Sequence, residues 1–254
     1  MVTSSLNYNS FGHIFISEKD DCNAIVDAML AVNYSEDFCI AESFAPEFIA
    51  RLMEAGFLVM SMNLHEDYKF VQGVNPFYFL MPRLHTVRSA LFFENLHVKK
   101  SIRRLLNRYE LRPNVEFDRI IDRCIEKHGS AWLTPPLVEV IKKLRRCKQA
   151  KVSPFCFGLY RGGSLVAGEF GIVCGKVYTS YSGFYDESNA GTVQLILATQ
   201  YLQEQGFLFF DLGMPLDYKT ELGAVDIDAK EFVRLFRRGT DYSNPTISFT
   251  ASMS

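Results

Sequence analysis

The sequence lacks the features that mark membrane and secreted proteins. No apolar run reaches the roughly 18 residues that a membrane-spanning helix needs. Residues 1–10 are polar and hold no basic region followed by an apolar one, so they do not resemble a secretory signal. Internal repeats are also missing. We therefore expect a cytoplasmic protein without membrane contact.

The cysteines are too scattered for a metal site. They lie at positions 22, 39, 124, 147, 156 and 174, without a Cys-x-x-Cys pair or a Cys/His cluster. Isolated thiols of this kind pack as small apolar residues in a reducing compartment. We therefore expect neither a metal nor another cofactor.

Net charge is also low, but it is unevenly distributed. The whole chain carries only −2, whereas residues 97–151 hold fifteen lysines and arginines against six acidic residues, a local charge of +9. The remainder must then carry −11. This asymmetry favours a local binding site for a polyanion. The alternative is two solvated helix faces that are basic without a partner.

The chain of 254 residues is 48% hydrophobic, enough for one large core and a small second domain. Apolar spacing and stop signals predict helices over 20–30, 45–55, 97–109, 117–127, 136–148, 190–205 and 228–237. Extended segments are predicted at 57–62, 77–80, 155–160, 165–173, 177–182 and 207–211, separated by glycine-containing turns. The order from residue 152 predicts an α/β (α+β) domain with a mixed sheet.

Several motifs in this order resemble one known family. The segment 175–195 contains Tyr-Ser-Gly-Phe followed by Asn-Ala-Gly-Thr, similar to the family's Glu-Ser-Met-Phe and Asn-Ala-Ser-Lys. Shorter matches are Pro82-Arg83, His97 to Ser101, Ala131 to Thr134, Phe210 to Gly213 and Leu222 to Ala224. By this pattern, which covers about residues 40–237, the chain resembles the bacterial leucyl/phenylalanyl-tRNA–protein transferases.

The resemblance implies a GNAT-like acyltransferase domain at 76–240, preceded by a small N-terminal domain at 1–75. The composition of residues 241–254 indicates a polar tail. The implied partners are aminoacyl-tRNA, through its acceptor stem, and the N-termini of acceptor proteins; we expect a monomer. The implied reaction is attack of an α-amine on the ester that joins an amino acid to tRNA. Because that ester is already activated, the enzyme must mainly position, deprotonate and stabilise an oxyanion.

Asp211 is the first candidate for a catalytic carboxylate. It ends an apolar strand, where a charge is costly unless it is paired or used. The alternative is a structural aspartate that caps the following loop. The resemblance adds Tyr181 and Ser182 to the catalytic set, with Tyr181 standing where the family has Glu. It also places Gly213 where the family has a Gln thought to assist proton transfer.

The resemblance assigns binding roles to two further groups. Trp132, the only tryptophan, corresponds to a position beside the terminal adenosine of tRNA, where an aromatic ring can stack on a base; the alternative is an ordinary core tryptophan. Asn189 opens a helix that we expect near the tRNA end or the substrate backbone. The acceptor-stem phosphates are expected on a basic helix face made of Lys99, Lys100, Arg103 and Arg104.

The pocket for the donor amino acid departs from the family pattern. The family's pocket is apolar, but Glu169 and Gly183 stand at its two Met positions and Ala198 at its Phe position. Tyr178 and Leu195 complete the expected pocket. A roomier pocket with a carboxylate suits a long cation such as arginine. The alternative is that Glu169 faces solvent from its strand.

These departures predict an arginyl donor and an acceptor with N-terminal Asp or Glu, since Tyr181 removes the charge that would meet a cationic acceptor. The first alternative is leucyl or phenylalanyl transfer to N-terminal Arg or Lys. Two further alternatives are a non-catalytic tRNA-binding relative and a GNAT acetyltransferase. The last would need a Gly-x-Gly loop before the 190–205 helix, and Ser188 to Thr192 does not supply one.

Overall fold

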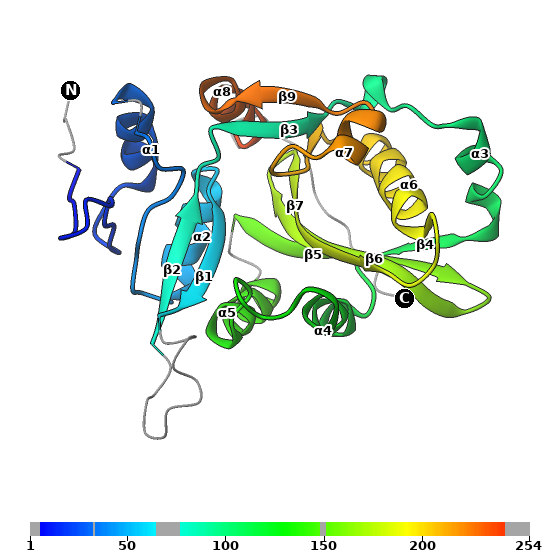
Figure 1. Ribbon diagram of the computed structural model, residues 1–254, viewed down its shortest axis with the longest axis horizontal. Coiled ribbons are helices and arrows are strands. Elements are labelled where there is room, and N and C mark those ends of the chain that lie inside the picture. Colours follow the sequence, from blue (N-terminus) through cyan, green and yellow to red (C-terminus); the bar gives the residue numbers. More distant parts are fainter. Residues whose placement is uncertain (1–5, 33, 65–76, 148–150, 242–254) are drawn as a thin grey trace.

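The computed structural model describes residues 6–32, 34–64, 77–147 and 151–241, which form a mixed α+β fold (Figure 1). The helices are α1 (Cys22–Ala31), α2 (Pro46–Glu54), α3 (Lys100–Arg103), α4 (Phe117–His128), α5 (Pro135–Arg146), α6 (Ala190–Glu204), α7 (Asp217–Glu221) and α8 (Ala229–Gly239), with 3-10 turns η2 (Phe93–Asn95) and η3 (Leu106–Arg108). The strands are β1 (Leu58–Asn63), β2 (Tyr78–Arg83), β3 (Val87–Leu91), β4 (Glu110–Pro113), β5 (Val152–Arg161), β6 (Ser164–Cys174), β7 (Val177–Tyr185), β8 (Phe209–Asp211) and β9 (Val225–Asp228). None of these helices is long and apolar enough to cross a membrane.

The main sheet has seven strands in the order β4-β5-β6-β7-β8-β3-β9. All neighbouring pairs are antiparallel except β7 and β8, which are parallel and joined through α6. Helix α6 contacts one face of the curled sheet, whereas α4 and α5 lie against the other (Figure 1). The predicted mixed sheet is therefore confirmed.

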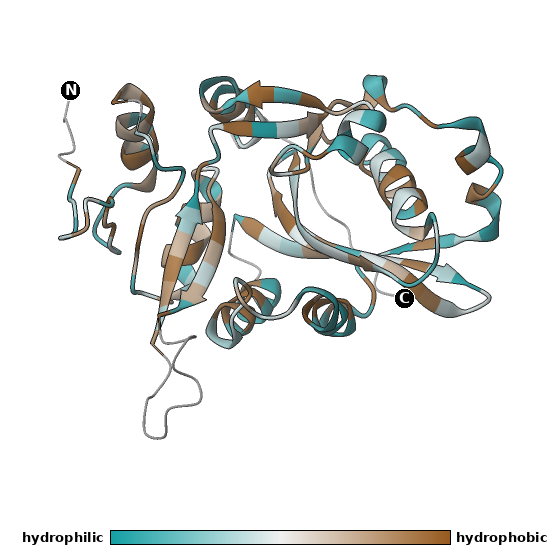
Figure 2. Cartoon of the chain, viewed as in Figure 1, coloured by the Kyte–Doolittle hydropathy of each residue, from teal (hydrophilic) through white to brown (hydrophobic). Residues whose placement is uncertain are grey.

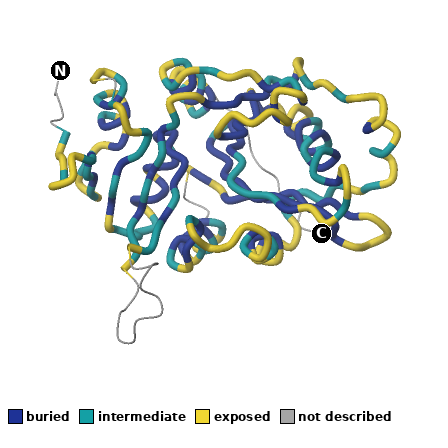
Figure 3. The backbone as a smooth tube through the Cα atoms, viewed as in Figure 1, coloured by how far each residue is buried: buried dark blue, intermediate teal, exposed yellow. Residues whose placement is uncertain are grey.

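The central strands are covered on both faces, and their sequence reflects this. Strands β5 and β6 are buried at nearly every position, which explains their long apolar runs in place of an alternating pattern (Figures 2 and 3). Gly162 and Gly163 close the hairpin between them with φ of 58° and 82°, values that favour glycine. The predicted meander is confirmed.

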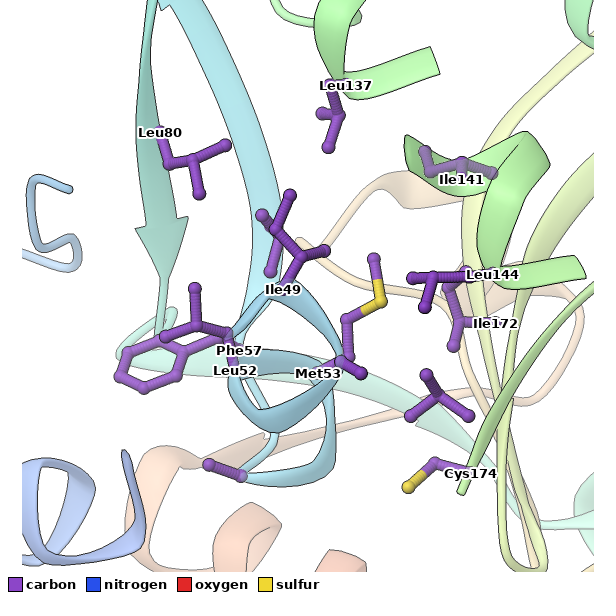
Figure 4. Packing of buried hydrophobic residues seen from close by; sticks show 14 of the residues in the cluster. Ile49, Leu52, Met53, Phe57, Leu80, Leu137, Ile141, Leu144, Ile172 and Cys174 are labelled. Atoms are coloured by element: carbon purple, nitrogen blue, oxygen red, sulfur yellow. The ribbon is translucent and has the colours of Figure 1, made fainter. Parts of the chain in front are cut away.

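The N-terminal elements form a layer beside the main sheet. Strands β1 and β2 make a separate antiparallel hairpin, and α2 packs between it and α5, with Ile49 and Met53 directed toward Ile141 and Leu144 (Figure 4). The hairpin crosses the expected boundary at residues 75 and 76, so β2 belongs with β1 instead of with the following strands. The division into domains itself remains a prediction. Residues 65–76, between β1 and β2, and the expected polar tail beyond residue 241 lie outside the described residues.

Most predicted helices are confirmed within a few residues, but the helix over 97–109 is wrong. Only α3 and η3 form there. Neither has a side-chain cap, and the closely spaced cations would repel one another on a longer helix. The apolar residues of this segment still face the interior. Ile102 belongs to a hydrophobic cluster that includes Val193 and Ile196 of α6, and Val98 and Leu105 pack against that cluster.

The segment is fastened to α7 by a close backbone approach. His97 N–H donates to the Leu222 carbonyl at 2.9 Å. Next to it, Gly223 has a φ of 98°, and a Cβ at Gly223 would lie 1.9 Å from the carbonyl oxygen of Asn95. Only glycine fits this crossing without moving the backbone.

We predict that Gly223→Ala lowers the free energy of unfolding by at least about 3 kcal/mol, because it adds a backbone clash to the cost of a positive φ. The control is Gly206→Ala, since Gly206 has a φ of 75° but nothing within 4 Å of the added Cβ. That variant should lose only about 1–2 kcal/mol. Urea unfolding measures both, and equal losses would contradict the close approach.

Candidate active site

Asp211 lies at the end of β8 in a fully buried polar cluster. Its Oδ1 accepts from Arg88 Nε at 3.2 Å and from the Gly213 N–H at 3.0 Å. Its Oδ2 accepts from an Arg88 terminal nitrogen at 2.6 Å and from Thr179 Oγ1 at 3.0 Å. Strands β3, β7 and β8 each contribute one member, so this cluster joins three neighbours of the sheet.

These contacts bear on the chemistry of Asp211. Two donors engage each carboxylate oxygen, and the Arg88 side chain is 1% exposed while Asp211 is 0% exposed. A carboxylate whose acceptor sites are filled holds its donors in a fixed geometry. The geometry therefore suits a positioning role for Asp211, which holds the Gly213 peptide in place by accepting its N–H. Its assignment as a catalytic residue remains a prediction.

Arg88 is the main site residue that the sequence analysis missed. It stacks over the ring of Phe232 in α8, 4.2 Å from the centroid, and its second terminal nitrogen, like Ser89 Oγ, has no hydrogen-bond partner. A lone arginine in the apolar run that ends at Phe93 was the available signal, since a buried guanidinium needs a carboxylate partner.

Tyr181 lies close to the same cluster. In the pairing of β6 with β7, Phe170 faces Ser182 and Gly171 faces Ser180, so Tyr181 is the extra residue of a β-bulge. Bulges re-aim side chains and are frequent beside active sites. The Tyr181 hydroxyl accepts from the Val59 N–H at 3.1 Å, which brings β1 against the main sheet. Burial is the main cause that raises the pKa of Tyr181, so it stays neutral at physiological pH.

Trp132 lies on the same side of the molecule as Tyr181. The two ring centroids are 6.4 Å apart, and Trp132 is partly buried against the main core. Its carbonyl accepts from the Ser61 N–H at 3.0 Å. The structure therefore brings Tyr181 and Trp132 together, as the expected site requires, while the stacking role of Trp132 remains a prediction. The carbonyl oxygen of Ser182 accepts a weak hydrogen bond from the Cys124 thiol at 3.4 Å.

Glu169 is buried, which contradicts the alternative that it faces solvent. It is 3% exposed and lies opposite Gly183 in the strand pairing. Its Oε2 accepts from Ser180 Oγ at 3.1 Å. Its Oε1, the Tyr178 hydroxyl and the Gln194 amide nitrogen make no well-aligned hydrogen bond, although Tyr178 and Gln194 lie close enough to Glu169 to lower its pKa. Such a group of incompletely hydrogen-bonded polar atoms is uncommon in a native interior, which makes this cluster a candidate binding site.

The surroundings of Glu169 set its proton affinity. Burial raises its pKa to about 7, and the hydroxyls of Ser180 and Tyr178, the Gln194 amide and the charge of Lys219 each offset part of that rise. Gly183 packs closely against Glu169, because a Cβ at Gly183 would lie only 3.1 Å from the Glu169 Cβ. The carboxyl group can therefore change protonation state near neutral pH.

The other expected pocket residues line α6. Ala198 is fully buried in the same apolar cluster as Tyr178, and Leu195 packs against that cluster. Asn189 is exposed at the start of α6 with a φ of 67° and makes no side-chain cap. The structure thus gathers Glu169, Gly183, Tyr178, Ala198 and Leu195 around one face of the sheet, and leaves Asn189 at the helix end.

The expected tRNA-binding cations are all exposed, although no long helix presents them. Lys99 pairs with Glu221 at 2.6 Å, whereas Lys100, Arg103 and Arg104 make no ion pair within the described part of the chain. The second basic segment differs. In α5, Lys142 lies 3.6 Å from Asp118 and Lys143 lies 2.6 Å from Glu139, so acids offset much of its charge.

Comparison with known proteins identifies the class. A model of the leucyl/phenylalanyl-tRNA protein transferase family matches residues 90–237. The transferase of Pseudomonas putida (strain W619) is 30% identical over 162 residues, 62% of this chain and 70% of the relative. That of Christiangramia forsetii is 30% identical over 208 residues, 76% of this chain and 95% of the relative. That of Thermosynechococcus vestitus is 28% identical over 179 residues, 66% of this chain and 87% of the relative.

The matched residues run from β3 through α8 and include both buried carboxylates. The chain is an aminoacyltransferase. It belongs to the leucyl/phenylalanyl-tRNA protein transferase family, so the resemblance seen in its motifs is confirmed. Among solved structures, L-PGS from Bacillus licheniformis has a TM-score of 0.42 at 12% identity, covering 92% of this chain and 88% of that one; so low a score supports no argument.

We predict that Arg88→Met costs about 3–5 kcal/mol of folding stability, because it leaves a buried carboxylate without its counter-charge. The control is Arg234→Met, which breaks an exposed pair with Glu231 and should cost less than about 1 kcal/mol. Asp211→Asn should lower the free energy of unfolding less in the Arg88→Met background than in the parent, because the ion pair is already broken there. Urea unfolding tests this, and similar losses for the two Arg→Met variants would show that the buried pair does not support the fold.

Proposed function

We propose that this chain transfers an amino acid from aminoacyl-tRNA to the N-terminal α-amine of acceptor proteins in the cytoplasm, and so marks them for degradation through an N-degron pathway. Family membership is the observation that carries the proposal. A GNAT-like fold for residues 76–240 belongs to the same proposal, as does a monomeric state. The β7-α6-β8 unit, with its carboxylate at the end of β8, is compatible with such an acyltransferase.

The reaction forms an amide bond and breaks the ester to the tRNA ribose. The neutral α-amine attacks the ester carbonyl, loses a proton, and the ribose oxygen leaves and takes a proton up. An α-amine with a pKa of about 7.7–8.0 is partly neutral at pH 7, so positioning supplies much of the catalysis. Asp211 and Gly213 are the proposed centre, with Tyr181 and Ser182 beside it. Since Gly213 has no side chain, proton transfer falls to water or to a ribose hydroxyl.

Two donors compete. The names of the relatives favour leucyl- or phenylalanyl-tRNA, which would be paired with acceptors that begin with Arg or Lys. The buried Glu169 favours arginyl-tRNA and acceptors that begin with Asp or Glu. A guanidinium could meet the Glu169 carboxylate through two parallel hydrogen bonds, whereas an apolar side chain would leave that carboxylate incompletely paired at a cost of about 1–3 kcal/mol. Protonation of Glu169 near pH 7 would lessen that cost.

The proposed tRNA surface is the exposed basic segment around α3. Three cations, Lys100, Arg103 and Arg104, lie in one short stretch without acidic partners among the described residues. At the edge of this stretch, Lys99 forms an ion pair with Glu221. Such cations position phosphates without reading sequence. The proposed stacking of Trp132 on the terminal adenosine would then fix the other end of the acceptor strand.

The direct test of function is incubation with labelled aminoacyl-tRNA or labelled acetyl-CoA and peptides that begin with Asp, Glu, Arg or Lys. Label from tRNA in the peptide supports transfer. Label from acetyl-CoA alone would make the chain an acetyltransferase, and tight tRNA binding without transfer would make it a non-catalytic relative.

We predict that Lys100, Arg103 and Arg104 replaced together by Ala weaken tRNA binding and flatten its salt dependence. Each lost phosphate contact should reduce the slope of log K against log salt by about 0.7–0.9. The matched control removes three cations from α5, namely Lys142, Lys143 and Arg146. Filter binding at several salt concentrations measures both, and a larger change in the control would place the tRNA on α5.

We predict that Glu169→Met lowers the ratio of arginyl to leucyl transfer at least tenfold, equivalent to about 1.4 kcal/mol, because it removes the carboxylate that would bind a guanidinium. The control is Glu139→Met, whose carboxylate is exposed and paired with Lys143. Single-turnover rates with both charged tRNAs give the ratio. If the parent transfers Leu well and Arg not at all, the arginyl candidate fails while the transferase stands.

A further inference from the structure

Lys219 in α7 is a buried cation that the proposed reaction has not used. The residue is 6% exposed, and no carboxylate lies within ion-pair distance of its amine among the described residues. Burying an unpaired ammonium is costly, so such a residue is kept only where its hydrogen bonds matter. No motif in the sequence pointed to it, because an isolated lysine in a polar stretch usually lies at the surface.

The contacts of its amine are specific. Lys219 Nζ donates to the carbonyl of Leu212 at 2.6 Å and to that of Met214 at 2.7 Å. These two carbonyls flank Gly213, whose N–H donates to Asp211 and whose own carbonyl accepts from the Ser89 N–H at 2.7 Å. Both backbone groups of Gly213 and the carbonyls on either side of it are therefore hydrogen-bonded, and Lys219 supplies two of these bonds from outside the sheet.

The position of the amine relative to the two buried carboxylates is equally distinctive. Burial lowers the pKa of Lys219 to about 8. The charges of Asp211, Glu169 and Asp226 act to raise the pKa, and that of Arg88 acts to lower it. The pKa of the amine is therefore affected by the charges of both buried carboxylates, Asp211 in β8 and Glu169 in β6. Burial raises the pKa of the neighbouring Tyr218, and the charge of Glu169 raises it further.

We propose that Lys219 is a positioning residue for the transfer reaction, which clamps the turn from Leu212 to Met214 so that the Gly213 peptide and Asp211 stay aligned beside the donor pocket. This inference rests on the proposed function. A turn that follows a three-residue strand and contains a glycine with a φ of 75° would otherwise be free to reorient. The two hydrogen bonds from Lys219 restrain a backbone that Gly213, without a side chain, does not restrain.

The experiment compares Lys219→Met, which keeps the length of the side chain but donates no hydrogen bond, with Lys230→Met, which removes an exposed lysine from α8. Single-turnover transfer, tRNA affinity and melting temperature are measured for each. We expect Lys219→Met to lower the transfer rate at least tenfold, with tRNA affinity within threefold of the parent and a melting temperature that is unchanged or raised. Lys230→Met should match the parent throughout.

The pH profile separates positioning from simple support of the fold. In the parent, the rate should fall above pH 8 as the ammonium loses a proton and one of its N–H donors. That descending limb should be missing in Lys219→Met. Lys219→Gln, which retains an amide donor without charge, should be slower than the parent but faster than Lys219→Met, and should also lack the limb.

A transfer rate of Lys219→Met within twofold of the parent would overturn the inference. So would a lost rate that is matched by a lower melting temperature in both the Met and the Gln variants, because Lys219 would then only support the fold. If the parent itself transfers no amino acid from any charged tRNA, the proposed function fails first, and this role fails with it.

Discussion

The buried ion pair between Arg88 and Asp211 is the interaction on which the rest of the site depends. It joins β3 to β8 and receives a third member, Thr179, from β7. Because both charges are withdrawn from water, removing either leaves the other uncompensated. The pair therefore fixes the end of β8, and through the Gly213 N–H it fixes the turn that follows.

A second buried carboxylate, Glu169, lies in the same sheet but differs from Asp211 in its charge partners and hydrogen bonds. Asp211 is paired with a cation and accepts two hydrogen bonds on each oxygen, whereas Glu169 has no cation within ion-pair distance among the described residues and burial raises its pKa to about 7. One carboxylate is thus suited to hold structure and the other to meet a ligand. Lys219 donates hydrogen bonds to the backbone on both sides of Gly213, and the charges of both carboxylates act to raise its pKa.

The sequence was informative where the periodicity was strong. Amphipathic helices such as α4 and α5 and the long strands β5 and β6 could be predicted, because burial of a continuous apolar face decides their structure. The strands β3, β4 and β9 were missed, since four or five residues of mixed character, such as Val87–Leu91, give no clear pattern. The helix expected over 97–109 failed because packing onto α6 and repulsion among cations overrode its apolar spacing.

The site followed the same division. The motif pattern indicated Asp211, Glu169, Tyr181 and Trp132, whose neighbourhoods are now visible. Arg88 stands out only as a lone charge in an apolar run, and its partner Asp211 lies 123 positions away. Lys219 gave no signal, because an isolated lysine in a polar stretch usually lies at the surface. Burial of Glu169 could not be read from strand alternation either, since both faces of β6 are covered.

The measurement that tests the account most directly is the mass of an acceptor peptide after incubation with the enzyme and a full set of twenty charged tRNAs. The account predicts a product heavier by one amino-acid residue, added at the peptide's N-terminus, and the mass of that residue names the donor. Peptides that remain unmodified with every charged tRNA, while the folded enzyme binds tRNA, would contradict it.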